Sequence, residues 1–228
     1  MRALLGEAAV VIFNDVTPEG REEFYRWHDR EHIPERLAIP GFRRGRRFGR
    51  RGHSPEWLTL YEADDLAVLT SPAYLARLNA PTPATVSAVA HFRNTARSIC
   101  RVVHSVGDST GGHVLALPLR VPAERGDAVA RALIEDAFPR VIDTTGIVAC
   151  HLFAADMTAS FARTTESKGR AFDVPPWAVL CEASTAEAAA AAMIVIQDEL
   201  ARHGMEAPGG GAVYALEICR LATHEQPG

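Results

Sequence analysis

Side chains able to move protons are concentrated in residues 27–48, WHDREHIPERLAIPGFRRGRRF. At about 100° per residue, one face of a helix would carry Phe24, Trp27, His28, Glu31 and Glu35, with His32 at its edge. A core face is ordinarily apolar throughout, so this mixed face predicts either a polar cavity or a satisfied hydrogen-bonded pair. For the first case, the predicted substrate-binding residues are Trp27, His28 and Glu31.

His28 and His32 also have the spacing at which two imidazoles on a helix can share a metal ion, with Glu31 close by. A zinc-protease helix carries Glu directly after its first His, whereas Asp29 follows His28 here. No third ligand is evident. We therefore predict no metal site.

The predicted helix runs from Pro18 to about His32 and ends or kinks near Ile33, because Pro34 removes a backbone hydrogen bond and crowds the preceding turn. A short second turn follows through Leu37. At a helix end the dipole would favour a charged His32, whose pKa could then move across neutrality. A purely structural His32 would instead bond Glu31, Glu35 or a loop carbonyl.

The arginines of residues 42–50 lie in a predicted strand, in which alternate side chains share a face. Phe42, Arg44, Arg46 and Phe48 would point one way, and Arg43 and Arg47 the other. If the phenylalanines face the interior, Arg46 needs an anionic partner, which is either Glu62 or a substrate. A solvated or ion-paired strand is the favoured interpretation.

Tyr61 shares a face of the next strand with Trp57 and Thr59. In an apolar pocket its hydroxyl could act on a substrate carbonyl or enolate. The more common role of such a tyrosine is packing in the core, with its hydroxyl bonded to the backbone.

The composition is that of a globular protein: 47% of the 228 residues are hydrophobic, 23% are charged, and the net charge is −4. No apolar run approaches the length of a membrane span, and the acidic balance gives no general attraction to nucleic acid. The first residues lack a signal-peptide cleavage pattern. The four cysteines form no CxxC pair, which indicates free thiols in a reducing compartment. These features predict a cytoplasmic protein that binds neither membrane nor nucleic acid.

The order of predicted elements repeats. Strand, helix, two strands, helix and strand fill residues 8–106, and the same order follows from residue 113. Gly41-Phe42 and Gly146-Ile147 are 105 residues apart, and Trp57 and Trp177 are 120 apart, so an insertion falls in residues 157–176. We predict an α+β fold of two tandem ferredoxin-like βαββαβ units, residues 1–108 and 109–228, whose antiparallel sheets pack face to face as an intramolecular barrel. The chain would be a monomer with an internal pseudo-dimer, or a homodimer of such monomers.

Four motifs, W-H-D-x-E-H-I-P-E-R-L, P-G-F-R-R-G-R-R-F, W-L-T-L-Y-E and S-P-A-Y, make residues 8–105 similar to the EthD-like branch of the dimeric α+β barrel superfamily. The second half resembles it only in element order and lacks the histidine motif. The resemblance implies a barrel of two ferredoxin-like units, here from one chain, with an interior pocket. It also implies a catalytic or substrate-orienting role for His32, and it favours Arg47 over Arg46 as the substrate-binding arginine. The superfamily includes cofactor-free monooxygenases, muconolactone-type isomerases, polyketide cyclases and haem proteins.

The predicted function is that of a cofactor-independent enzyme that acts on a small cyclic or aromatic metabolite by proton transfer. The catalytic residues would be His32 and Tyr61, and Arg46 or Arg47 would position substrate oxygens. Isomerisation, cyclisation and oxidation all remain open. The alternative is a non-catalytic binding or structural protein, and haem binding is a weaker third possibility.

Overall fold

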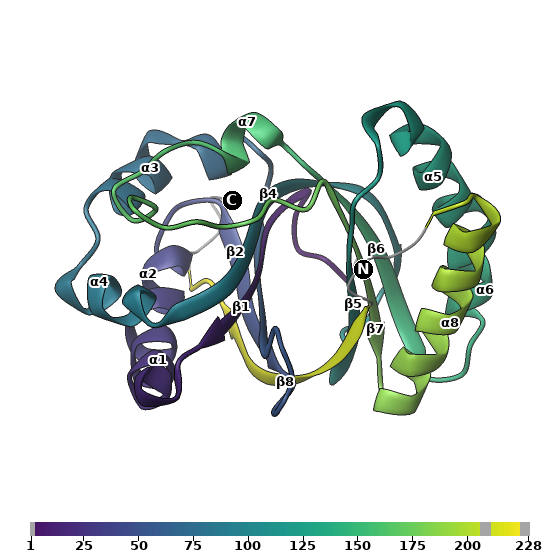
Figure 1. The fold of residues 1–228 in the computed structure, drawn as a ribbon, viewed down its shortest axis with the longest axis horizontal. Coiled ribbons are helices and arrows are strands. Elements are labelled where there is room, and N and C mark those ends of the chain that lie inside the picture. Colours follow the sequence, from purple (N-terminus) through teal and green to yellow (C-terminus); the bar gives the residue numbers. More distant parts are fainter. Residues whose placement is uncertain (1–2, 206–210, 224–228) are drawn as a thin grey trace. The chain divides into compact units, whose positions relative to one another are not determined.

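The computed structural model describes residues 3–205 and 211–223 (Figure 1). Two compact units share these residues. The first unit comprises Leu5–Cys100, Asp156–Val174 and Glu217–Gly228, and the second comprises Met1–Leu4, Arg101–Ala155 and Pro175–Leu216. The sequence insertion therefore packs with the first unit. The predicted repeats, 1–108 and 109–228, concern duplication of the sequence and stay a prediction.

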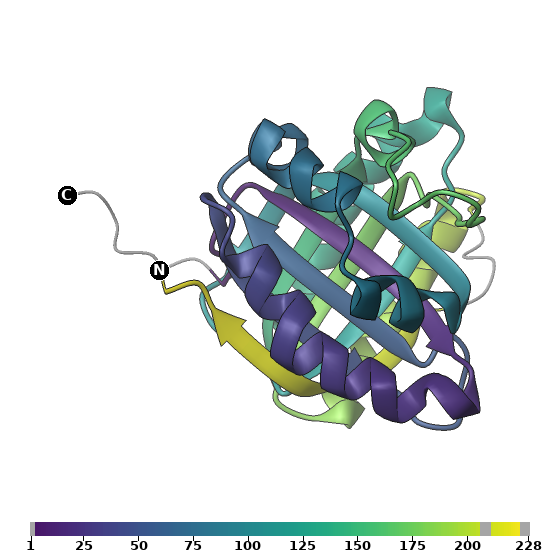
Figure 2. The same ribbon diagram turned by 90° about the vertical axis from the view of Figure 1, so that its left-hand side faces the viewer.

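In the first unit, β1 (Ala8–Val16) and β2 (Phe42–Gly49) pair antiparallel with β3 (Trp57–Ala63) between them. Helices cover one face of this sheet, and in Figure 2 the first helix lies in front of the strands. The helical elements are η1 (Pro18–Gly20), α1 (Arg21–Trp27), η2 (His28–His32), α2 (Ile33–Leu37), η3 (Val68–Thr70), α3 (Pro72–Asn79), α4 (Pro83–Ala90) and, in the insertion, α7 (Met157–Ser160). The strand β4 (Phe92–Gly107) begins in this unit.

The first helix kinks where Pro34 predicts it, and the kink is a π-helical turn, η2. The wider turn accommodates the missing N–H of Pro34, which lies at the start of α2. The helix then continues to Leu37. His32 is therefore inside the helix, and the prediction that it lies at a helix end was wrong.

The second unit has the strands β5 (His113–Leu119), β6 (Ile147–Ala155) and β7 (Trp177–Ala183), with β7 between the other two. The strand β8 (Ala212–Leu221) pairs with β5 on its other side. Its helical elements are η4 (Ala123–Arg125), α5 (Gly126–Ala132), η5 (Leu133–Ala137), α6 (Phe138–Ile142) and α8 (Ala186–Arg202). Among the described residues, no helix is both long and apolar enough to cross a bilayer.

Local irregularities recur in both units. The π-helical turn η5 is followed by Pro139 as η2 is by Pro34. Gly41 and Gly146 then adopt φ values of 92° and 91°, a left-handed conformation that favours glycine, just before the second strand. That strand is bulged at its first residues in each unit, after Phe42 and after Ile147.

The bulge corrects one prediction about strand faces. It places Phe42 on the helix side, where its ring lies 6.4 Å from that of Tyr61 and 5.3 Å from that of Tyr74. Arg46 points to the opposite face and pairs with Glu62 at 3.0 Å. Phe42 and Arg46 therefore do not share a face, because the bulge shifts the alternation by one residue.

A buried glutamate on the third strand anchors each unit. Glu62 accepts a hydrogen bond of 2.9 Å from the peptide N–H of Leu5 and is paired with Arg44 and Arg46. Glu182 likewise accepts a bond of 2.9 Å from the N–H of Gly111 and lies 3.3 Å from His151. These bonds tie the chain before the first strand to the sheet.

Replacement Glu62→Gln is expected to lower the free energy of unfolding by about 3–5 kcal/mol, because it leaves the guanidinium groups of Arg44 and Arg46 buried without their carboxylate. Urea unfolding measures this change. The matched control is Glu22→Gln, which removes the exposed pair with Arg26 and should change stability by no more than about 0.5 kcal/mol. Equal effects of the two substitutions would contradict the anchoring role.

Candidate functional site

The π-helical turn brings three of the predicted side chains together. The rings of His28 and His32 stack with centroids 5.7 Å apart, and the ring of Trp27 lies 4.2 Å from His32. All three side chains are buried, with 3% of His28 and 7% of His32 exposed. On β3, Tyr61 faces these rings at 6.1 Å from His32. The resemblance implied a site in the interior pocket of the barrel, but these side chains lie on the sheet face that the helices of their own unit cover.

His28 is held at both ring nitrogens. Its Nδ1 lies 3.0 Å from Nη1 of Arg47, and its Nε2 lies 3.2 Å from the hydroxyl oxygen of Tyr61. A guanidinium only donates, so Nδ1 accepts and Nε2 carries the proton that it donates to Tyr61. The hydroxyl proton of Tyr61 is thereby left for a different acceptor. With both nitrogens engaged, His28 cannot join His32 in binding a metal ion, and no group of three metal-ligating side chains occurs in the described part of the chain.

Arg47 lies behind His28. It donates to Asp29 at 2.5 Å and to Glu217 at 2.8 Å, and 3% of its side chain is exposed. Its charge is therefore already balanced by two carboxylates. The structure assigns Arg47 contacts that orient His28, and Arg46 contacts with Glu62 on the other face of the sheet.

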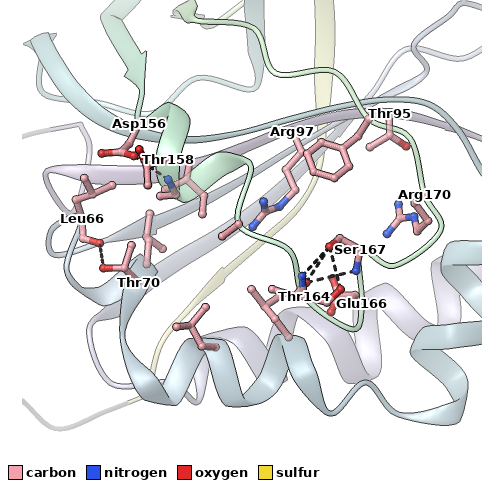
Figure 3. A pocket seen from close by; sticks show the side chains of 17 residues that line it. Leu66, Thr70, Thr95, Arg97, Asp156, Thr158, Thr164, Glu166, Ser167 and Arg170 are labelled. Carbon is pink, nitrogen blue, oxygen red and sulfur yellow. Dashed lines mark hydrogen bonds between the residues drawn. The ribbon is translucent and has the colours of Figure 1, made fainter.

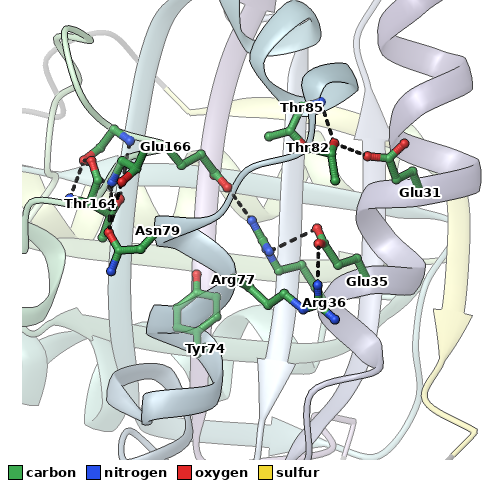
Figure 4. A network of polar contacts seen from close by, with 12 residues as sticks. Glu31, Glu35, Arg36, Tyr74, Arg77, Asn79, Thr82, Thr85, Thr164 and Glu166 are labelled. Atoms are coloured by element: carbon green, nitrogen blue, oxygen red, sulfur yellow. Dashed lines mark hydrogen bonds and ion pairs between the residues drawn. The ribbon is translucent and has the colours of Figure 1, made fainter.

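Among the described residues, no carboxylate makes the contact with His32 that a structural role would lead us to expect. Its Nδ1 is buried and has no hydrogen-bond partner among the described residues. Glu31 instead accepts from the hydroxyl of Thr82 at 2.5 Å, and Glu35 pairs with Arg36 at 3.3 Å (Figure 4). An unbonded polar atom in a buried position costs stability, about 1–3 kcal/mol.

His32 lines a small cavity, and a larger cavity adjoins the small one. The small cavity, about 50 Å³, is lined by His32 and Tyr61 together with Val10, Ile12, Trp27, Arg36, Tyr74, Val89, Phe92, Thr95, Arg97, Glu166 and Arg170. The large cavity, about 440 Å³, shares four of these lining residues: Thr95, Arg97, Glu166 and Arg170. Figure 3 shows Arg97 in the middle of the large cavity, with Asp156 and Leu66 on one side of it and Arg170 on the other. Of the seven predicted site residues, Trp27, His32 and Tyr61 line the small cavity.

Glu166 and Arg170 of the insertion also line the cavities, although no sequence pattern pointed to them. Glu166 accepts a hydrogen bond of 2.5 Å from the buried Arg36 (Figure 4), and its peptide N–H donates to the carbonyl of Leu78. The insertion is thereby fastened over both cavities, bringing Glu166 and Arg170 to their wall. The available signal was the extra length of the second half, which places residues in a loop but does not say where the loop folds.

Burial and neighbouring charge set the protonation of the site. Burial lowers the pKa of His32 well below its usual value, and the charge of Arg36 lowers it further. Burial, followed by the charge of Arg47, lowers the pKa of His28. Burial raises the pKa of Tyr61. At neutral pH the site therefore holds two neutral imidazoles and a protonated hydroxyl. The expectation that a helix dipole favours a charged His32 was wrong, because the helix continues past this residue.

These lowered histidine pKa values predict acid sensitivity. Below about pH 6.5 the histidines of the unfolded chain bind protons, whereas the buried histidines of the folded chain stay neutral. The free energy of unfolding is therefore highest above this pH and decreases as the pH falls. The decrease is up to about 1.4 kcal/mol per pH unit for each histidine. His28→Leu should reduce the loss between about pH 6 and pH 5 by up to that amount. Urea unfolding across this pH range measures the slope. The exposed His53 provides the control: His53→Leu should keep the wild-type slope, and an unchanged slope in His28→Leu would contradict the buried neutral state.

No family model and no curated protein matches this chain. Solved structures do resemble it. An anthrone oxidase-like protein superposes with a TM-score of 0.64 at 12% identity, covering 98% of this chain and 97% of that chain. A putative monooxygenase from Fusobacterium nucleatum has a TM-score of 0.52 at 9% identity over 96% and 95% of the two chains. A putative monooxygenase from Lactobacillus acidophilus has 0.52 at 10% over 95% and 96%.

At such identities the likeness concerns the fold alone. Membership of the dimeric α+β barrel superfamily, and of its narrower EthD-like branch, therefore stays a prediction. The chain thus shares its fold with these structures over nearly its whole length.

Proposed function

We propose that the chain is a cofactor-independent enzyme that binds a small cyclic or aromatic metabolite in the cavities of the first unit and moves a proton with His32. The observation that carries the proposal is the free Nδ1 of a buried, neutral His32 beside a small cavity. Tyr61 lines the same cavity, and its hydroxyl proton is directed away from His28 by the bond described above. A neutral histidine and a tyrosine thus line one small space.

This pair fits the removal of a proton from carbon next to a carbonyl group. His32 takes the proton, and the electron pair left behind moves onto the carbonyl oxygen, to which Tyr61 donates a hydrogen bond. Isomerisation, ring closure and oxidation by molecular oxygen can all follow from the resulting enolate. Oxidation is the outcome favoured by the neighbours, one titled anthrone oxidase-like and two titled putative monooxygenase.

A comparison within the chain supports a functional origin for these polar groups. We infer that the chain is a tandem duplication of a ferredoxin-like unit, because the π-helical turn, the following proline and glycine, and the bulged strand all recur with an offset of 105 residues. Leu133 and Ala137 then stand where the first unit has His28 and His32. Leu152 corresponds in the same way to Arg47.

After the insertion point the offset becomes 120, so that Cys181 corresponds to Tyr61. The second unit therefore folds the same junction of helix and sheet with an apolar core, in which Leu133, Ala137, Leu152 and Cys181 are all buried. The fold does not require histidine, arginine or tyrosine at these places. The first unit keeps polar side chains at these positions although their burial costs stability, which favours a role for them in ligand chemistry.

We also propose that the protein works in the cytoplasm. All four cysteines are unpaired thiols, which fits the reducing cytoplasm. We also propose that the duplicated chain works as a monomer with an internal pseudo-dimer, or as a homodimer of such monomers.

His32→Leu separates a functional histidine from a structural one. The substitution removes the unbonded Nδ1 at similar volume, so the free energy of unfolding at neutral pH should rise by about 1–2 kcal/mol, while stabilisation by ligands is lost. Thermal-shift screening with aromatic acids, lactones and cyclic ketones, run on both proteins, measures the two effects together. A destabilised variant that still responds to the same ligands would make His32 a structural residue.

Tyr61→Phe keeps the ring and removes only the hydroxyl. It should slow the exchange of a carbon-bound proton in a bound cyclic ketone by about 100-fold or more, because the enolate oxygen loses its donor. Exchange from deuterated water, followed by nuclear magnetic resonance, measures the rate. Cys181→Ser, at the corresponding position of the second unit, is the control and should retain the wild-type rate. A non-catalytic binding protein would show no exchange above the solution rate in any of these proteins.

A further inference from the structure

The two cavities differ in what they can hold. The small cavity, about 50 Å³, is well below the roughly 150 Å³ of an apolar cavity that holds benzene. A ring does not fit there. The large cavity, about 440 Å³, lies within the range of small-molecule sites, about 300–1,000 Å³. The body of a ligand must therefore lie in the large cavity and present only its reacting group to His32 and Tyr61.

The walls of the large cavity are largely apolar. Leucine side chains from the segment after β3 and from α3 face Ile99 of β4 and Phe172 of the insertion; the leucines are Leu66, Leu69, Leu75 and Leu78. Such a lining fits a hydrocarbon ring or chain. An apolar ligand alone would not require charged residues in this lining. Arg97 and Arg170 nevertheless line the large cavity where it adjoins the small one.

The charges at this junction do not balance. Glu166 is already paired with the buried Arg36 at 2.5 Å. Arg97 donates to the neutral hydroxyl of Tyr74 at 3.1 Å, and the guanidinium of Arg170 lies 5.3 Å from the ring centre of Phe92. Neither of these two arginines has a carboxylate partner among the described side chains. Asp156, the other acid of the lining, caps α7 by accepting from the N–H of Ala159.

We propose that the substrate of this site is a carboxylic acid with an apolar ring body, and that Arg97 and Arg170 bind its carboxylate. The proposal rests on the function proposed above and specifies its substrate class. Two guanidinium groups on an apolar wall suit a carboxylate, since each can donate two hydrogen bonds to it. The carboxylate would lie at the junction of the cavities, the ring against the leucines, and the reacting carbonyl in the small cavity.

Carboxylate binding would also act on the base. The groups that surround His32 are His28 and Arg36 on its own helix, Tyr61 and Arg97 on the strands, and Glu166 and Arg170 on the insertion. The charges of Arg36, Arg170 and Arg97 all lower the pKa of His32. Burial is the main cause of the low pKa of His32 and persists in the complex, but an anion between Arg97 and Arg170 opposes two of these three charges and so acts to raise the pKa. His32 is then a stronger base when substrate is present than when the site is empty.

The test compares 2-naphthoate with 2-naphthamide, which has the same ring body and no charge, by isothermal titration calorimetry on the full chain at neutral pH. We expect the wild type to bind the carboxylate at least about tenfold more tightly than the amide. Arg170→Gln and Arg97→Gln should each weaken carboxylate binding by about tenfold and weaken amide binding much less, because the amide carries no charge. Arg163→Gln, an exposed arginine of the same insertion that lines neither cavity, should behave as wild type.

The outcomes separate the two proposals. Equal binding of acid and amide by the wild type, or no binding of either, overturns the carboxylate site without any variant having to fold. Carboxylate selectivity that survives both arginine substitutions overturns the assignment to Arg97 and Arg170. Selective, arginine-dependent binding in a protein that exchanges no substrate proton supports the carboxylate site and rejects the proposed enzyme. If the protein exchanges protons of neutral ketones but does not prefer acids over amides, the proposed enzyme is supported and the carboxylate site is rejected.

Discussion

The hydrogen bond between Arg47 and Nδ1 of His28 fixes the state of the whole site. Because a guanidinium can only donate, the bond determines which nitrogen of His28 carries a proton and, in turn, how the hydroxyl of Tyr61 is used. Asp29 and Glu217 hold the guanidinium in place and balance its charge. A buried neutral histidine can therefore orient a tyrosine without itself gaining or losing a proton.

The backbone around His28, His32, Arg47 and Tyr61 does not depend on these polar side chains for its conformation. In both units a π-helical turn, a proline and a left-handed glycine lead into a bulged second strand. The second unit fills this junction with leucine, alanine and cysteine, and the first with histidine, arginine and tyrosine. The same backbone can thus serve as a packed core or as a site, and the difference lies in a few side chains. The buried carboxylates Glu62 and Glu182 are present in both units, as expected for groups that hold the sheet itself.

The insertion adds a wall of the cavities beside the helix-covered sheet of the first unit. The carboxylate of Glu166 reaches a buried arginine 130 residues earlier in the chain, and Phe172 and Arg170 complete the cavity wall. Removing Arg36 from water is costly unless its charge is paired, so the ion pair fastens the insertion as well as satisfying the arginine. Enclosure by the insertion also lowers the local dielectric, which strengthens the effect of each charge on His32.

The sequence by itself determined the order of elements, the kink at Pro34 and the grouping of Trp27, His28 and His32, because these depend on local periodicity and on the geometry of proline. It also provided the alternatives for Arg46, of which Glu62 is the partner found. Only the tertiary structure decided which sheet face the histidines occupy, since periodicity defines a face but not what covers it. The bulge that turned Phe42 to the helix side, and the insertion that brought Arg170 and Glu166 to the cavities, likewise depend on contacts between residues far apart in the chain, which no local pattern encodes.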